Sequence, residues 1–199
     1  MRQSNGKMYV AVTGGIGSGK STVIKMIGER GFHVYSADEA ARNIYDDPLV
    51  KAKVRTVFPE CFSGDVPDRK KLAEEMFADR NKLEQLNGIT HPAIMEKLFV
   101  RAESDSDRVI FFEIPLLFES GYEGRFDKVI VVMRDKSLRI NSVMRRDGLS
   151  EEQVKARIAN QIDYEKIQKT AHTIIYNNGD LPSLRNRVNG ILDEIFKGK

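Results

Sequence analysis

The stretch Gly14-Gly-Ile-Gly-Ser-Gly-Lys-Ser21 decides the fold of this 199-residue chain. It matches the phosphate-loop pattern G-x-x-x-x-G-K-[ST] at every defined position. The apolar run Tyr9–Thr13 precedes the loop, and Ser21–Arg30 after it has the apolar spacing of a helix. Strand, loop and helix in this order are the context that the pattern requires. The sequence therefore predicts an α/β core built around a phosphate-binding loop.

The residue types of this loop suit a nucleoside triphosphate. Glycine has no Cβ, so the backbone N–H groups can converge on phosphate oxygens, and the following helix adds the partial positive charge of its N-terminus. We expect Lys20 to reach the β- and γ-phosphates and the Ser21 hydroxyl to ligate Mg²⁺. The expected nucleotide contacts in this segment are Gly14, Gly15, Ile16, Gly17, Ser18, Gly19, Lys20, Ser21 and Thr22.

Short apolar runs recur along the rest of the chain. The predicted strands are Met8–Val12, Phe32–Tyr35, Val109–Ile114, Val129–Met133 and Thr173–Tyr176. Near-continuous apolar character is typical of strands that are buried on both faces of a parallel sheet. Because helical segments separate them, we predict an α/β fold of the P-loop NTPase type, with a parallel five-stranded sheet flanked by helices.

Two helical segments are longer than a simple crossover. Residues 37–107 look entirely helical, whereas a crossover needs only about a dozen residues plus its loops, so an inserted helical subdomain is predicted. Residues 135–169 form a second helical segment rich in arginine. The core then comprises residues 1–36, 108–134 and 170–199. Helix starts are expected at Ser36, Asp47, Asp68 and Ser150, which have the residue types and spacing of N-caps.

Further candidate side chains lie after the predicted strands. Asp38, in the first turn after the second strand, either accepts the proton of an acceptor hydroxyl or only complements its helix dipole. Glu113 ends the third strand, where either a Mg²⁺-organising carboxylate or a solvated acid is expected. Arg139 and Arg146 are seven residues apart and share a helical face, so they either close over the transferring phosphates or form an ordinary charged face. Arg134 and Arg145 are further candidates of the same kind.

Composition and missing motifs exclude several classes. The formal charge of +3 (32 Lys+Arg against 29 Asp+Glu) is weak and is not gathered into a basic block, so no nucleic-acid partner is expected. We expect no membrane partner, since no apolar run approaches about 20 residues, and no secretory signal. The single cysteine, Cys61, fits a reducing cytoplasm. The Asp-x-x-Gly motif of GTPase switches is absent from the sequence, and a translocating ATPase normally has a larger core.

The remaining motifs run in order along nearly the whole chain and, together with the loop, resemble dephospho-coenzyme A kinases. They are Ser36-Ala-Asp38 with Ala41-Arg42, Thr90-His91-Pro92-Ala-Ile94, Pro115-Leu-Leu-Phe-Glu119, Arg145-Arg146-Asp147, Arg157 with Gln161, Lys166, and Asn177-Asn-Gly179. Two alternatives remain: another small-molecule or nucleoside monophosphate kinase of the P-loop superfamily, and a non-catalytic nucleotide-binding module.

The resemblance implies transfer of the ATP γ-phosphate to the ribose 3′-hydroxyl of dephospho-coenzyme A, with Mg²⁺. It implies that residues 37–107 bind the coenzyme A substrate and that residues 135–169 form a lid. The catalytic residues would be Lys20, Asp38 as base or hydroxyl positioner, and Arg146 as a lid arginine. The expected substrate-binding residues are Asp38, Arg42, His91, Arg139, Arg157 and Gln161, and Asn177 and Gly179 would lie beside the adenine.

Two positions depart from the family pattern. The family often has aspartate at the positions of Ser36 and Glu113. Ser36 can still cap its helix, so the first change has little consequence. Glu113 carries one more methylene, which leaves open whether its Mg²⁺ contact is direct or through water. The first six or seven residues extend beyond the usual start of the family and are expected to form a disordered lead.

Overall fold

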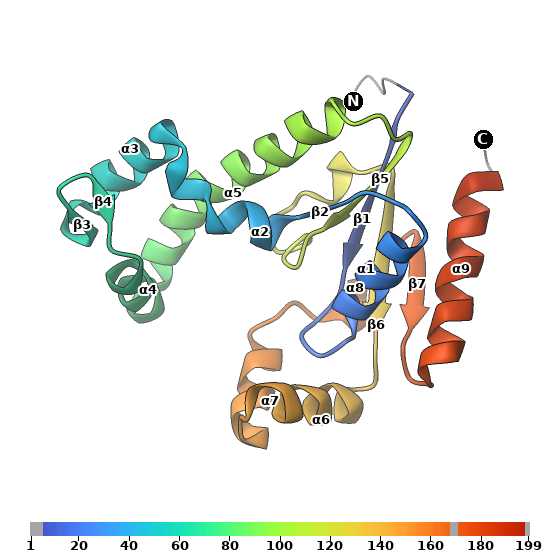
Figure 1. Ribbon diagram of the computed structural model, residues 1–199. Coiled ribbons are helices and arrows are strands. Elements are labelled where there is room, and N and C mark those ends of the chain that lie inside the picture. Colours follow the sequence, from blue (N-terminus) through green and yellow to red (C-terminus); the bar gives the residue numbers. More distant parts are fainter. Residues whose placement is uncertain (1–5, 168–170, 198–199) are drawn as a thin grey trace. The chain divides into compact units, whose positions relative to one another are not determined.

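The structure is a computed structural model that describes residues 6–167 and 171–197. The predicted lead therefore lies almost wholly outside the described residues, as do positions 168 and 169 of the predicted lid and position 170 of the predicted core. The chain divides into two compact units, one formed by the residues up to Tyr35 together with those from Ser106 onward, the other by Ser36–Asp105. Figure 1 shows the elements of both units along the chain.

The first unit is built on a five-stranded sheet, which confirms the predicted fold class. The strands are β1 (Met8–Thr13), β2 (Val34–Ser36), β5 (Val109–Glu113), β6 (Lys128–Met133) and β7 (Thr173–Tyr176), in the order β2-β5-β1-β6-β7. β1 pairs in parallel with both β5 and β6, and β6 pairs in parallel with β7. Each strand lies within two or three residues of its predicted bounds. β1, the origin of the phosphate loop, occupies the centre of the sheet.

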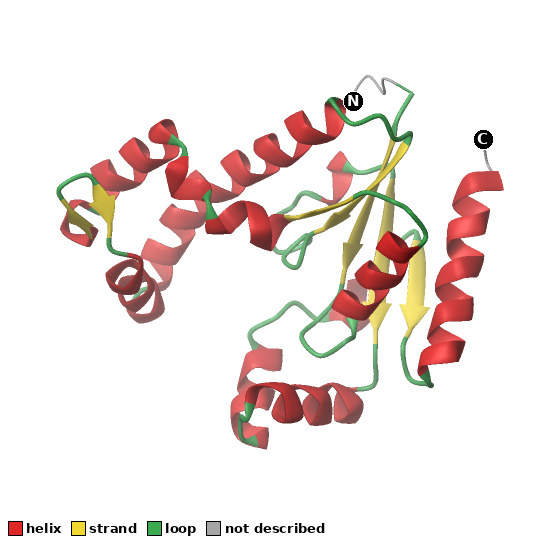
Figure 2. Cartoon of the chain, viewed as in Figure 1, coloured by secondary structure: helices red, strands yellow, loops and turns green. Residues whose placement is uncertain are grey.

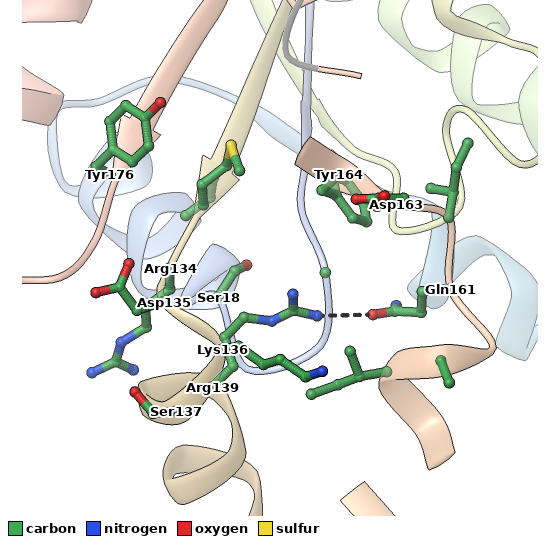
Figure 3. Close-up of a pocket in the computed structure, with 16 residues that line it drawn as sticks. Ser18, Arg134, Asp135, Lys136, Ser137, Arg139, Gln161, Asp163, Tyr164 and Tyr176 are labelled. Atoms are coloured by element: carbon green, nitrogen blue, oxygen red, sulfur yellow. Dashed lines mark hydrogen bonds between the residues drawn. The ribbon is translucent and has the colours of Figure 1, made fainter. Parts of the chain in front are cut away.

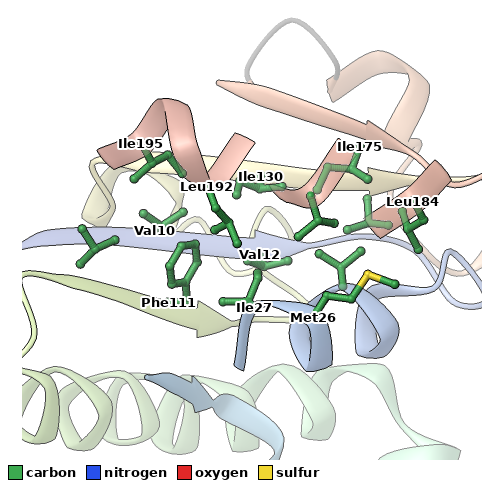
Figure 4. Packing of buried hydrophobic residues seen from close by; sticks show 14 residues of the cluster. Val10, Val12, Met26, Ile27, Phe111, Ile130, Ile175, Leu184, Leu192 and Ile195 are labelled. Atoms are coloured by element: carbon green, nitrogen blue, oxygen red, sulfur yellow. The ribbon is translucent and has the colours of Figure 1, made fainter. Parts of the chain in front are cut away.

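One face of this sheet is covered by helices α1 (Lys20–Glu29) and α9 (Leu181–Lys197), which also pack against each other. Along α9 the buried residues Leu184, Val188, Leu192 and Ile195 recur every three or four positions, so they form one apolar stripe. They meet side chains of the central strands such as Val12 (Figure 4). Because residues of β1 that point to opposite faces are all buried, the sheet is covered on both sides.

The arginine-rich segment contains three helices, α6 (Lys136–Asp147), α7 (Glu151–Ala159) and α8 (Tyr164–Ile167). α6 ends at Gly148, whose φ of 67° is the left-handed conformation common at helix C-termini. α7 begins at the predicted capping box, in which Ser150 and Gln153 each accept the backbone N–H of the other. Ile140, Val143 and Val154 form a small buried cluster to which Ile16 of the phosphate loop adds its side chain.

The second unit is mostly helical, with α2 (Ala37–Arg42), α3 (Pro48–Val57), α4 (Arg69–Ala78) and α5 (Arg80–Glu103) shown in red in Figure 2. α2, α3 and α4 all pack against α5. The predicted caps Ser36, Asp47 and Asp68 each accept backbone N–H groups of the helix they begin. The remaining elements are 3₁₀ turns at Ile44–Asp46, Pro59–Cys61 and, in the first unit, Glu123–Arg125.

One expectation for the second unit was wrong. The unit is not entirely helical, because β3 (Phe62–Ser63) and β4 (Val66–Pro67) pair as a short antiparallel hairpin. Gly64 makes this tight turn possible with a φ of 61°. His91 lies inside the 24-residue helix α5, as does Pro92. Packing of three helices against α5 outweighs the helix-breaking tendency of proline.

No helix within the described part of the chain combines the length and the apolar character needed to cross a membrane.

Candidate functional site: the phosphate loop and its surroundings

The phosphate loop joins the carboxyl end of β1 to the first turn of α1. Gly19 occupies the N-cap position of α1 with a φ of 91°, a left-handed conformation that favours glycine. Because the N-cap residue is glycine, no side chain caps the start of α1. No acidic residue lies in the first turn of this helix, all of which is described. The N–H groups of Thr22 and Val23 donate to the Gly19 carbonyl. A helix N-terminus that lacks a side-chain cap and an acidic first turn is suited to an external anion, as at phosphate-binding helix ends.

Lys20 and Glu113 form an ion pair at this edge of the sheet. Lys20 Nζ lies 3.3 Å from Glu113 Oε1, and the two side chains are only 15% and 16% exposed. The sheet register explains the pairing, since Glu113 of β5 lies opposite Val12 of β1, two residues before the loop begins. The sequence predicted both residues for the site, and the structure brings them together.

Asn177 joins the end of β7 to the loop. Its side chain is 8% exposed, and Nδ2 donates a 2.8 Å hydrogen bond to the backbone carbonyl of Ser18. A Cβ on Gly19 would collide with the same Nδ2 atom, so the contact also requires glycine at that position. The neighbouring Asn178 bonds Asp135 instead, at the start of α6. Gly179, also expected beside the adenine, is exposed in the turn that precedes α9.

Arg139 and Gln161, both predicted to bind substrate, contact the phosphate loop. Arg139 Nε donates to the carbonyl of Ile16 at 2.9 Å, and Gln161 Oε1 accepts the N–H of Ile16 at 2.8 Å. The two side chains also meet each other, with Arg139 Nη2 3.4 Å from Gln161 Oε1 (Figure 3). The Ile16 peptide is therefore held from the α6 side and from the segment after α7.

A cavity of about 740 Å³ opens beside the loop. Its wall includes three cationic side chains and two carboxylates, those of Arg134, Lys136, Arg139, Asp135 and Asp163, with the aromatic ring of Tyr176 at its edge (Figure 3). Two polar atoms on its lining residues, Ser18 Oγ and Arg134 Nε, are buried without a hydrogen-bond partner anywhere in residues 6–167 and 171–197. Three cations against two carboxylates give the wall a net positive charge, which suits a polar ligand that carries negative charge.

The predicted lid arginine Arg146 pairs with its neighbour in the last turn of α6. Its Nε and Nη2 donate to the two carboxylate oxygens of Asp147, at 2.7 and 3.0 Å. Arg157 of α7 shares the same carboxylate, with Nη1 3.5 Å from Asp147 Oδ2. The forked bond from Arg146 lowers the pKa of Asp147, and Asp147 in turn raises the pKa of Arg146. Neither arginine lines the cavity beside the loop.

Three predicted acceptor residues belong to the second unit. Asp38 and Arg42 are exposed and lie four residues apart on α2, so they share a helical face. His91 lies on α5, the helix against which α2 packs. His91 is half-buried, and this burial lowers its pKa from the ordinary value of 6.5, which favours the neutral imidazole.

Comparison with known proteins decides the family. Residues 8–183 match the model of the dephospho-CoA kinase family. The chain belongs to the dephospho-CoA kinase family. It is thus a transferase, an ATP-dependent kinase that phosphorylates dephospho-CoA. The dephospho-CoA kinase of Fusobacterium nucleatum is 38% identical over 191 residues, covering 94% of this chain and 98% of the relative. That of Deinococcus radiodurans is 35% identical over 189 residues, covering 94% and 91%.

Solved structures agree with the assignment to dephospho-CoA kinases. The Campylobacter jejuni enzyme superposes with a TM-score of 0.72 at 35% identity, covering 96% of this chain and 98% of that one. A shikimate kinase from Acinetobacter baumannii superposes with a TM-score of 0.56 at 14% identity, covering 97% and 95%, and shares the fold alone. The expectation of a dephospho-CoA kinase on a P-loop kinase fold is thereby confirmed.

The sequence did not predict one side chain of this dephospho-CoA kinase, Tyr164, which contacts residues beside both the phosphate loop and Glu113. The hydroxyl of Tyr164 donates to the carbonyl of Pro115 at 3.3 Å and lies 3.4 Å from Thr13 Oγ1. Thr13 directly precedes the loop, and Pro115 follows Glu113 by two residues. Burial raises the pKa of Tyr164 to about 12, so the phenol stays protonated. A lone tyrosine in a charged segment has no pattern from which this contact can be predicted.

Proposed function

We propose that the phosphate loop holds ATP and that its γ-phosphoryl group passes to the ribose 3′-hydroxyl of dephospho-CoA. The observation that carries the proposal is the cavity beside the loop, whose wall has three cationic side chains against two carboxylates. The proposed nucleotide contacts are residues 14–22, with Lys20 on the β- and γ-phosphates. Asn177 and Gly179 remain proposed neighbours of the adenine.

Mg²⁺ fits the donor set at the start of α1. The exposed hydroxyl of Ser21 and the partly buried carboxylate of Glu113 are hard oxygen donors, the type that Mg²⁺ prefers. We propose that these two residues hold the ion. When bound, the ion would neutralise charge on the β- and γ-phosphates. Glu113 also pairs with Lys20, so one carboxylate orients the lysine that the nucleotide requires.

For the acceptor, we propose that residues 37–107 bind dephospho-CoA. Asp38 follows β2 by two residues, and ligands of open α/β sheets bind beyond the carboxyl ends of the strands. In the proposed step, the 3′-oxygen forms a bond to the γ-phosphorus while the bond from that phosphorus to the β,γ-bridging oxygen breaks. The hydroxyl proton goes to the Asp38 carboxylate, and ADP leaves. Arg42 and His91 are the proposed acceptor contacts beside it.

We propose that residues 135–169 act as a lid. Arg146 would stabilise the charge of the transferring phosphoryl group, and Arg139 and Arg157 remain proposed to contact the substrates. Gln161, which the sequence predicted as a substrate contact, instead accepts a hydrogen bond from the Ile16 N–H of the loop. Arginines in this role are worth about 10³-fold or more in turnover. Arg146 now pairs with the carboxylate of Asp147, and this pairing keeps the guanidinium of Arg146 charged. In the proposed closed lid, a phosphate would take the place of that carboxylate.

The decisive variant is Asp38→Asn. If Asp38 accepts or orients the hydroxyl proton, turnover falls by orders of magnitude while the affinity for ATP hardly changes. Glu39→Gln is the matched control, because it removes an equally exposed carboxylate one residue further along the same helical turn. Coupled ADP production and equilibrium ATP binding are the measurements. If Asp38→Asn weakened ATP binding as much as it lowered turnover, the assignment of Asp38 to the acceptor hydroxyl would be wrong.

The substrate proposal has its own test. ADP production is measured with dephospho-CoA and with a panel of nucleoside monophosphates under the same conditions. We expect acceleration by dephospho-CoA, and phosphate at the ribose 3′ position of the product by ³¹P NMR. Acceleration by the monophosphates alone would refute the proposal, and no acceleration with any acceptor would favour a nucleotide-binding module.

We further propose that the protein works in the cytoplasm, without a nucleic-acid or membrane partner. Its single thiol, on Cys61, is free and buried, and burial raises the pKa of that thiol. A protonated, buried thiol is unreactive, so it needs no oxidising compartment.

A further inference from the structure

We propose that Gln161 is a positioning residue for the phosphate loop. It acts by binding the Ile16 peptide, which Arg139 also binds. The inference rests on the proposed function, in that the loop it positions is the one that binds ATP. It differs from the expectation that Gln161 contacts substrate itself. In this role the glutamine sets the shape of the loop, and the loop binds the nucleotide.

The contacts of the Ile16 peptide carry the argument. Gln161 Oε1 accepts the Ile16 N–H at 2.8 Å, and the Ile16 carbonyl accepts from Arg139 Nε at 2.9 Å. Both distances lie in the range of good N–H···O hydrogen bonds, and both bonds are partly buried. These contacts also fix which end of the Gln161 side-chain amide is the oxygen, because the Ile16 N–H and Arg139 Nη2 both donate to it.

Two glycines of the loop, Gly15 and Gly17, lie against Arg139 and Gln161. A Cβ on Gly15 would come within 2.5 Å of Arg139 Nη2 and 3.2 Å of Gln161 Oε1. A Cβ on Gly17 would come within 2.6 Å of the backbone carbonyl of Arg139. The phosphate-loop motif leaves both positions free to vary. At Gly17 the backbone of Arg139 and a left-handed φ of 76° both favour glycine. At Gly15 a side chain would have to displace the guanidinium end of Arg139.

A loop with four glycines among eight residues needs external contacts to hold one conformation. Glycine loses more conformational freedom on ordering than any other residue. Without such contacts, the loop would lose this conformational entropy only when ATP binds, which would weaken ATP binding. The contact with Gln161 orders the first half of the loop in advance. While it lasts, the Ile16 N–H is bonded to Gln161 and is not available to a phosphate oxygen.

Substitution by glutamate separates positioning from direct substrate contact. A carboxylate at position 161 still accepts the Ile16 N–H and pairs more strongly with Arg139, so a positioning role survives in Gln161→Glu. If the amide instead donated to a phosphate oxygen, the same carboxylate would repel that phosphate. Leucine at position 161 abolishes both roles. The chain also offers a matched control in Gln153, whose Oε1 likewise accepts a backbone N–H, that of Ser150, in the cap of α7.

The experiment compares Gln161→Leu, Gln161→Glu and Gln153→Leu with the wild-type protein. For each, the KM for ATP, the KM for dephospho-CoA, kcat and the thermal midpoint are measured, together with ATP affinity by calorimetry without acceptor. We expect Gln161→Leu to raise the KM and Kd for ATP about 5-fold, the effect of losing one net hydrogen bond, with the KM for dephospho-CoA unchanged. Gln161→Glu should stay within about 2-fold of the wild type.

The outcomes are distinct. Unchanged ATP affinity in Gln161→Leu, or a rise in the KM for dephospho-CoA alone, overturns the positioning role. A Gln161→Glu variant that binds ATP as poorly as Gln161→Leu also overturns it, in favour of direct contact with phosphate. If Gln153→Leu weakened ATP binding equally, the effect would belong to helix stability, and the inference would fail. Absence of dephospho-CoA phosphorylation by the wild-type protein would instead contradict the proposed function.

Discussion

Asn177→Asp tests the bond that ties the end of the sheet to the phosphate loop. The substitution preserves the shape of the side chain but replaces the Nδ2 donor by an oxygen, 2.8 Å from the carbonyl of Ser18. The site is 8% exposed, so water cannot supply the missing partner readily. Leaving a buried acceptor unpaired costs about 1–3 kcal/mol, and a charged oxygen facing it costs more, so we expect about 2–3 kcal/mol of lost stability.

For a protein of about 200 residues, such a loss lowers the thermal midpoint by about 2–4 °C per kcal/mol, hence by about 4–12 °C. The assay is thermal and urea unfolding followed by circular dichroism. The loss also depends on pH. Burial beside a carbonyl raises the pKa of the new carboxyl in the folded state, and the protonated form can donate to Ser18. The folded variant then binds more protons than the unfolded one, so its stability deficit grows as pH rises above about 4.

Asn189→Asp is the matched control for this variant. Asn189 uses its side-chain oxygen to accept from Arg30, and aspartate retains that acceptor. Its stability should stay within about 0.5 kcal/mol of the wild type, as for most surface substitutions. An Asn177→Asp protein that melts at the wild-type temperature, with no dependence on pH, would refute the claim that this hydrogen bond stabilises the loop.

Two further predictions concern the titratable and metal-facing groups. Glu113→Gln should raise the Mg²⁺ concentration needed for half-maximal turnover, whereas Glu113→Asp should restore it; identical Mg²⁺ titrations for all three proteins would contradict the proposed metal contact. The pKa of folded His91 is lowered below its unfolded value near 6.5. The stability it contributes is therefore fully present above pH 6.5 and is lost as pH falls from there through the lower pKa of the folded state. His91→Gln should therefore flatten the decline in unfolding free energy between pH 7 and 5, and an unchanged slope would show that His91 does not cause it.

Local patterns predicted most of the core because they depend on neighbours in the chain. The loop motif, the apolar strand runs and the caps at Ser150 and Asp47 all appear in the structure where they were expected. A buried strand or an N-cap is decided within a few residues, so short windows of sequence contain the necessary information. The hairpin at residues 62–67 was missed, because its paired strands are only two residues long and leave no apolar run from which a strand could be predicted.

The identity of the loop, the fold class and the kinase family could be derived from residue order alone, because each depends on a motif whose atoms are close in the chain. The partners of individual side chains could not. Glu113 meets Lys20 through the register of β5 against β1, and Gln161 reaches Ile16 across 145 positions. Contacts of this kind depend on how strands pair and helices pack, which brings together residues that no spacing in the sequence relates.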